Sequence, residues 1–170
     1  MEEKMDNIRK YLVAGLEDRI DVLWEDKDIL WVDWREYDEA IIKHCEKILQ
    51  TGELDGEARE SESDMGFDIV IKFRNKEYII KYPGEEADRD TTIKTLNKVL
   101  SPDYEIRFWL DSIGSDTLAF IPKESKYWRE LENEFGTEKV RKYFSVIDEN
   151  SRMFDMEMNE IFKLMEELKK

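Results

Sequence analysis

The 170-residue chain has only one histidine, His44, and one cysteine, Cys45. With no second histidine, a zinc site or a serine-type triad lacks its parts. His44 falls on an apolar helical stripe and is expected at the core or its boundary. A lone cysteine cannot form an internal disulfide, and a free thiol fits a reducing compartment. Gly84 and Gly114 are isolated, so no phosphate-cradling loop is present. We therefore predict no catalytic residues, no metal site and no cofactor.

Long apolar runs are also missing. The longest reach three or four residues, as at Ala119-Phe120-Ile121, whereas a membrane span needs about 18. The amino terminus is acidic and lacks the basic-then-apolar layout of a secretory signal. We therefore expect a cytoplasmic protein that does not contact a membrane.

Cations are scarce relative to carboxylates, with 27 basic against 42 acidic side chains and a formal net charge of -15. This imbalance repels itself and costs stability, so it points to a positively charged partner. It opposes direct nucleic-acid binding, which needs a basic patch. An apolar content of 41% is enough for a core, and the length fits one domain over residues 1–170.

The first part of the chain is predicted to be helical and then disordered. Apolar residues three and four apart indicate one helix over 5–23 and a second from 33 or 34 to 50, which together form a helical hairpin over 1–52. Residues 53–66 carry six carboxylates against one arginine and almost nothing apolar. We expect them to form an acidic connector that is a loop or disordered.

A period of two then predicts strands, and the remainder is helical. Strands are expected over 67–73, 77–82, 104–110 and 117–121, with one helix over 90–100 between the second and the third. Residues 122–170 are predicted to form C-terminal helices. The resulting fold is α+β, a four-stranded, mostly antiparallel ββαββ sheet with the helical hairpin and the C-terminal helices packed on it.

In this arrangement three loops meet at one end of the sheet and make it acidic. The candidate partner-binding carboxylates are Glu85, Glu86, Asp88, Asp90, Asp111 and Asp116. For each one alone, an ordinary role in a helix cap or turn is the stronger interpretation.

Two further candidates come from the strand over 104–110, whose alternation places Arg107 and Trp109 on its outward face. Exposed tryptophan and arginine dominate protein interfaces, so Trp109 is a candidate apolar anchor. Burial of Trp109 under the amino-terminal helices is an equally good interpretation. Trp24, Trp31 and Trp34 are expected in the core or at the joint between helices, and the methionines of the final helix are expected in the core.

Two functions of other classes stay open. A metal-dependent hydrolase could use Asp68, Glu77 and the acidic loops, although Ile79 stands where a nuclease motif needs lysine. The chain could also be an acidic scaffold or regulatory subunit that dimerises through the Met and Phe face of the final helix.

Several segments resemble a known family: ADRDTTI at 87–93, LNKVL at 96–100, YEIR at 104–107, GSDTLAF at 114–120 and WRELE at 128–132, with Phe135-Gly136 after them. They are similar to bacterial immunity proteins encoded among polymorphic toxin systems, such as contact-dependent inhibition. The resemblance implies binding without turnover. We therefore predict an immunity protein, a monomer or weak homodimer, that binds a cognate basic toxin domain, a nuclease being one example, and occludes its substrate site.

Overall fold

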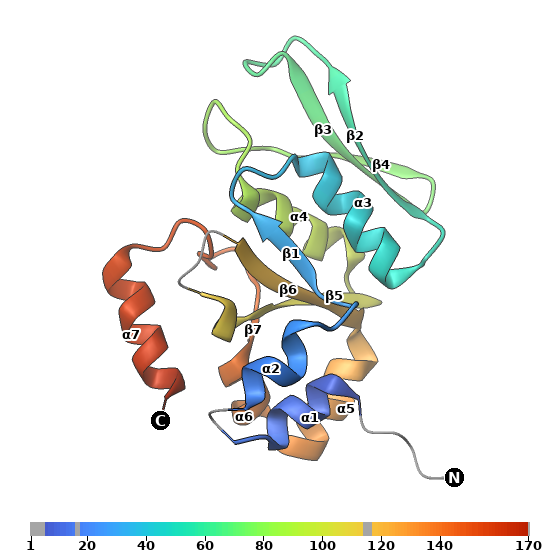
Figure 1. Ribbon diagram of the computed structural model, residues 1–170. Coiled ribbons are helices and arrows are strands. Elements are labelled where there is room, and N and C mark those ends of the chain that lie inside the picture. Colours follow the sequence, from blue (N-terminus) through green and yellow to red (C-terminus); the bar gives the residue numbers. More distant parts are fainter. Residues whose placement is uncertain (1–5, 16–17, 114–116, 170) are drawn as a thin grey trace.

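The computed structural model describes residues 6–15, 18–113 and 117–169, and it confirms a mixed α+β protein (Figure 1). Its strands form two antiparallel sheets. The larger sheet holds, in spatial order, β1 (Leu30–Asp33), β6 (Thr117–Glu124), β5 (Tyr104–Trp109) and β7 (Phe144–Val146), and the smaller holds β2 (Leu54–Glu60), β3 (Phe67–Phe73) and β4 (Lys76–Ile79). The helices are α1 (Asn7–Val13), α2 (Arg19–Trp24), α3 (Asp38–Leu49), α4 (Arg89–Leu100), α5 (Ser125–Phe135), α6 (Thr137–Tyr143) and α7 (Met158–Leu168), with a 3-10 turn η1 at Leu110–Ser112.

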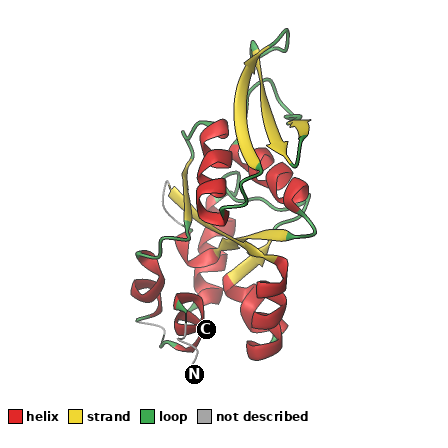
Figure 2. Ribbon diagram, turned by 90° about the vertical axis from the view of Figure 1, so that its right-hand side faces the viewer, coloured by secondary structure: helices red, strands yellow, loops and turns green. Residues whose placement is uncertain are grey.

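The prediction of a single ββαββ sheet is wrong. β3 and β4 belong to the smaller sheet, whereas β5 and β6 belong to the larger one. Helices α3 and α4 lie between the two sheets and contact both, as Figures 1 and 2 show. Each sheet is completed by strands from segments that were predicted to be helix or loop, namely β1, β2 and β7.

The predicted acidic connector over 53–66 is ordered, because most of it is β2 and the turn that leads into β3. Leu54 and Gly56 are buried against the body of the protein, while the alternate residues face outward. On that outer face the Glu57 carboxylate forms ion pairs with Arg59 at 3.0 Å and with Lys72 at 2.9 Å. The acidic composition suggested disorder, but cations on the same and the neighbouring strand offset the repulsion that would oppose folding.

The predicted helix over 5–23 is also divided. Asp6 caps α1 by accepting the N–H of Arg9, and α1 ends at Val13, before α2 begins at Arg19. The second predicted helix starts later, at Asp38, because residues 30–33 form β1 and a turn follows, in which the N–H of Glu36 donates to the carbonyl of Asp33. His44 lies on α3 and is exposed, so its predicted place at the core or its boundary is wrong.

Several predicted helices and strands in the middle of the chain are confirmed. Helix α4 and strand β5 match their predicted ranges within a residue, and α5 ends at Gly136 as expected. Strand β6 continues through Pro122, where we predicted its end. Proline has no N–H to donate, and it is tolerated there because β1 pairs with β6 only as far as Phe120. On the other side, Ile106 is opposite Pro122, and its N–H donates to the side chain of Asn97.

The larger sheet is covered on both faces, which decides the environment of β5. One apolar cluster joins the two sheets through α3 and α4, and a second lies between the larger sheet and α1, α2, α5 and α6. Of the two interpretations of Trp109, burial under the amino-terminal helices is confirmed, and the accessible apolar anchor is wrong; Arg107 is buried as well. Trp109 is fully buried, with its ring 5.8 Å from that of Tyr11 and 6.1 Å from that of Trp31.

The helices of the described residues are short. The longest, α3 and α4, have 12 residues each, and none in the described ranges is long and apolar enough to cross a membrane.

Candidate protein-binding surface

The predicted acidic end does not form as a whole, because Asp111 is engaged elsewhere in the protein. Asp111 faces α1 and α2, where it accepts two hydrogen bonds from Arg19, at 2.7 and 2.9 Å, and one from the hydroxyl of Tyr11. Both side chains of the Arg19–Asp111 pair are nearly inaccessible. Asp116 lies outside the described residues. Asp111 is therefore part of the internal structure and is unavailable to a partner in this conformation.

Arg107 is likewise engaged within the protein. Its guanidinium forms ion pairs with Glu105 and Glu132, both at 2.9 Å, and lies 4.7 Å from the centre of the Trp128 ring. Glu132 also pairs with Arg141 at 3.0 Å. Burial raises the pKa of Glu132, but the hydrogen bonds from the two arginines outweigh it and hold the pKa below its ordinary value.

The remaining candidates lie together around the start of α4. Asp88 is the N-cap, accepting the N–H of Thr91 at 2.7 Å and its hydroxyl at 2.8 Å. Asp90 is buried and accepts the backbone N–H of Phe154 at 2.8 Å and of Met153 at 3.1 Å. The ordinary structural interpretation therefore applies to these two carboxylates: one begins the helix and the other fastens the segment that precedes α7.

Glu85 and Glu86 differ from their neighbours. Both are exposed on the loop between β4 and α4, and neither forms an ion pair or hydrogen bond with any described part of the chain. Unpaired exposed carboxylates keep their full charge available for a partner. Of the predicted site residues that the structure describes, these two side chains are the ones that remain free.

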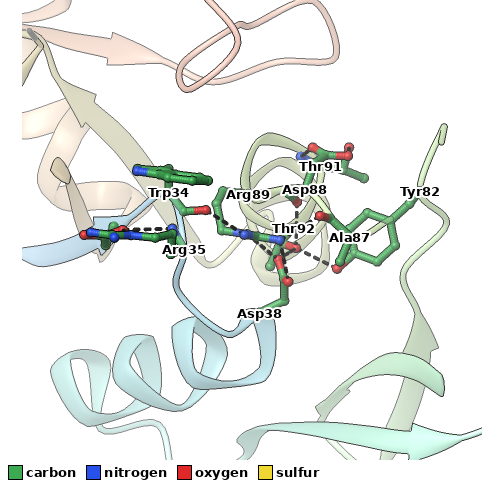
Figure 3. Close-up of polar contacts among 10 residues, drawn as sticks. Trp34, Arg35, Asp38, Tyr82, Ala87, Asp88, Arg89, Thr91 and Thr92 are labelled. Carbon is green, nitrogen blue, oxygen red and sulfur yellow. Dashed lines mark hydrogen bonds and ion pairs between the residues drawn. The ribbon is translucent and has the colours of Figure 1, made fainter. Parts of the chain in front are cut away.

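A buried ion pair holds this loop in place (Figure 3). Arg89 donates to Asp38 at the start of α3 through Nε at 3.0 Å and Nη2 at 2.8 Å. The same guanidinium donates to the backbone carbonyls of Trp34 and Ala87, both at 2.7 Å. Thr92 adds a hydroxyl hydrogen bond to Asp38 and contacts the hydroxyl of Tyr82 at 2.7 Å. One arginine thus connects three separate segments, the turn after β1, the start of α3 and the loop before α4.

The turn after β1 and the loop before α4 border a groove of about 1120 Å³, which we call the loop groove. One side is formed by Trp34 and Arg35, another by the loop over 83–88, and a third by the segment over 152–155. Its lining is mixed in charge, with five carboxylates and four cations. Recognition in this groove would therefore depend on matched pairs of charges more than on overall acidity.

A second, apolar groove adjoins the first and shares Trp34 and Phe154 with it. It has a volume of about 380 Å³, and four methionines contribute to it, so we call it the methionine groove. Trp34 is 53% exposed, Met158 61% and Phe162 58%, which makes an accessible apolar surface. The expectation that the final helix is core is therefore wrong for Met158 and Phe162, and Trp34 is not in the core, one of the two places expected for it.

Sequence reasoning favoured burial of the apolar stripe of the final helix, kept its exposure only as a dimerisation alternative, and did not connect it with Trp34. The available signal was the aromatic run around Trp34 together with a stripe of methionine and phenylalanine. Methionine is flexible and polarisable, and it is common on adaptable binding surfaces. What the sequence lacked was any indication that these two segments, more than 100 residues apart, meet at one groove.

Asp68 and Glu77, on which the metal-dependent alternative relied, lie on the smaller sheet. Glu77 forms an ion pair with Arg59 at 2.8 Å, which holds its pKa below the ordinary value. Across residues 6–15, 18–113 and 117–169, no three His, Cys, Asp or Glu side chains are grouped so that they could hold a metal ion. The two carboxylates belong instead to the charged outer face of the sheet.

The two grooves define a surface suited to a macromolecular partner, with apolar side chains beside free carboxylates.

Comparisons with protein-family models, curated proteins and solved structures found no match for this chain.

Proposed function

We propose that the protein is a non-catalytic immunity protein that binds a cationic toxin domain through the loop groove and the surface beside it. The observation that carries the proposal is the pair of free carboxylates, Glu85 and Glu86, on a loop fastened by Arg89 and next to the exposed Trp34. A fixed loop loses little conformational entropy on binding, which favours tight association. The resemblance of segments over 87–136 to immunity proteins points the same way.

Long-range and short-range electrostatics would have separate roles. The net charge of -15 attracts a cationic domain from a distance and speeds its association, an effect that salt weakens. At contact, Glu85 and Glu86 would pair with individual lysines or arginines. A toxin domain that holds phosphates in its substrate site has such cations there, so the bound protein would occupy the place of the substrate.

The test uses the polypeptide encoded immediately upstream of the gene for this chain. We expect its expression to be toxic and the wild-type protein to relieve the toxicity. In binding kinetics the E85K/E86K variant should dissociate faster and bind about tenfold or more weakly, because two contact charges are reversed.

The matched control is E62K/D64K. It changes the net charge by the same amount at exposed residues in the turn between β2 and β3. Both variants should associate more slowly, but only E85K/E86K should dissociate faster. Equal effects of the two variants would refute this surface, and failure of the wild-type protein to relieve toxicity would refute the immunity function.

A further inference from the structure

The methionine groove is built along one stripe of α7. Met158, Ile161, Phe162 and Met165 follow each other at helical spacing and line the groove, and Trp34 and Leu118 from other elements also line it. In Figure 1, α7 stands at the side of the body, outside the layers formed by the two sheets and the other helices. Among its residues only Leu168 is buried. The helix therefore presents an elongated apolar surface that its own packing uses incompletely.

Such a surface matches the apolar stripe of another helix. Met158 and Phe162 are one turn apart and both more than half exposed, so they would contact apolar side chains spaced three and four residues apart on an occupant. Trp34, which lines the same groove, would contact that occupant as well. Aromatic side chains in such positions are frequent hot spots of protein interfaces.

Charge decides which kind of helix fits. From Glu157 to Lys169 the chain carries four glutamates and two lysines, and the loop groove adds the free carboxylates Glu85 and Glu86 next to it. A second copy of this chain would bring the same negative charge to the contact, and each copy has a net charge of -15. Like charges oppose that pairing, whereas lysines and arginines beside the apolar stripe of an occupant would favour binding.

We propose that the methionine groove binds an amphipathic helix of the cationic partner, with its apolar stripe against Met158, Phe162 and Trp34. The inference rests on the proposed function and adds to it the kind of segment that is recognised. Lysines or arginines on the flank of that helix would reach Glu85 and Glu86. Four groove methionines can adjust their side chains to the occupant, so the groove can accept a stripe of varied apolar residues.

The test uses the whole protein with methyl-labelled methionines and a pair of synthetic helical peptides. Both peptides carry leucines at positions three and four apart, with lysines elsewhere in one and glutamates elsewhere in the other. The lysine peptide should shift the methyl signals of Met153, Met156, Met158 and Met165 in a saturable way. Met65, in the turn between β2 and β3, reports non-specific attraction to acidic surface and should not shift.

Two variants make the test specific. F162S removes an exposed groove side chain and should weaken binding of the lysine peptide about tenfold or more. I79S removes a similarly exposed apolar side chain on β4 and should leave the affinity unchanged. Because no toxin enters this experiment, it can fail while neutralisation succeeds, and the reverse.

Any of four results would overturn the inference: equal binding of the glutamate peptide, no binding of either peptide, a shift of Met65 as large as that of the groove methionines, or equal losses in the two variants. A wild-type dimer that F162S converts to a monomer would also overturn it, since a second copy would then occupy the groove.

Discussion

Replacing Arg89 by methionine should be one of the most destabilising single changes in the protein. Arg89 and Asp38 form a buried pair, with 14% and 6% of their side chains exposed. In the R89M variant the Asp38 carboxylate would stay buried with the Thr92 hydroxyl as its remaining side-chain partner. An uncompensated buried charge costs about 3–5 kcal/mol of folding free energy. The carbonyls of Trp34 and Ala87 would lose their donor as well.

The nearby pair of Arg35 and Asp33 provides the control. It joins the same kinds of side chain at 3.3 Å, but 67% of the Arg35 side chain is exposed. Exposed pairs contribute about 0–1 kcal/mol, so R35M should change stability very little. The D38L/R89M double variant removes both charges and should be more stable than R89M alone, because the isolated charge is then gone.

The measurement is the free energy of unfolding from urea titrations of the four proteins, with the slopes compared to confirm two-state behaviour. R89M and R35M with equal stabilities would refute the reasoning. So would a double variant less stable than R89M, since that would assign the cost to lost packing instead of the unpaired carboxylate.

Two other changes test the packing of the smaller sheet and the network around β5. G56A should destabilise the folded protein by about 1–3 kcal/mol, because a Cβ at Gly56 would lie 2.7 Å from the Cβ of Ile42. The control G84A, where nothing lies within 4 Å of the added Cβ, should show no such loss in thermal unfolding. Equal unfolding midpoints of G56A and G84A would contradict this account. Hydrogen bonds from Arg107 and Arg141 hold the pKa of Glu132 in the folded protein below its ordinary value of 4.5. Ionised Glu132 therefore stabilises the folded protein above pH 4.5, and this stabilisation is lost as the pH falls through the folded-state pKa. E132Q should therefore flatten the acid side of the curve of unfolding free energy against pH, and an unchanged slope there would count against the ion-pair network.

Strand β5 illustrates how far a pattern in the sequence can be trusted. The alternation of Tyr104, Ile106 and Phe108 with Glu105, Arg107 and Trp109 indicated a strand, and the strand is present. The same alternation indicated a single buried face, which is wrong, because helices from both ends of the chain cover the second face. An ion pair to Glu132 lets Arg107 be buried there, and alternation alone carries no information about such a partner.

In the acidic segment over 53–66, by contrast, the sequence pattern failed to predict a strand that is present. Its composition is typical of disordered chains, yet β2 forms because Leu54 and Gly56 pack against α3 and because Arg59 and Lys72 offset the outward charges. Lys72 is supplied by β3, so its contribution is visible only once the two strands are paired.

The sequence by itself determined the α+β class, helices α4 and α5, strands β3, β5 and most of β6, because local periodicity, caps and stop residues act within a few residues of each other. It also determined the net charge of -15. Only the tertiary structure decided that the strands divide into two sheets, that Trp109 and Asp111 are internal, and that Trp34 meets the stripe of α7 beside Glu85 and Glu86. These outcomes depend on contacts between residues far apart in the chain, whose free energies come from burial and charge pairing that no local pattern records.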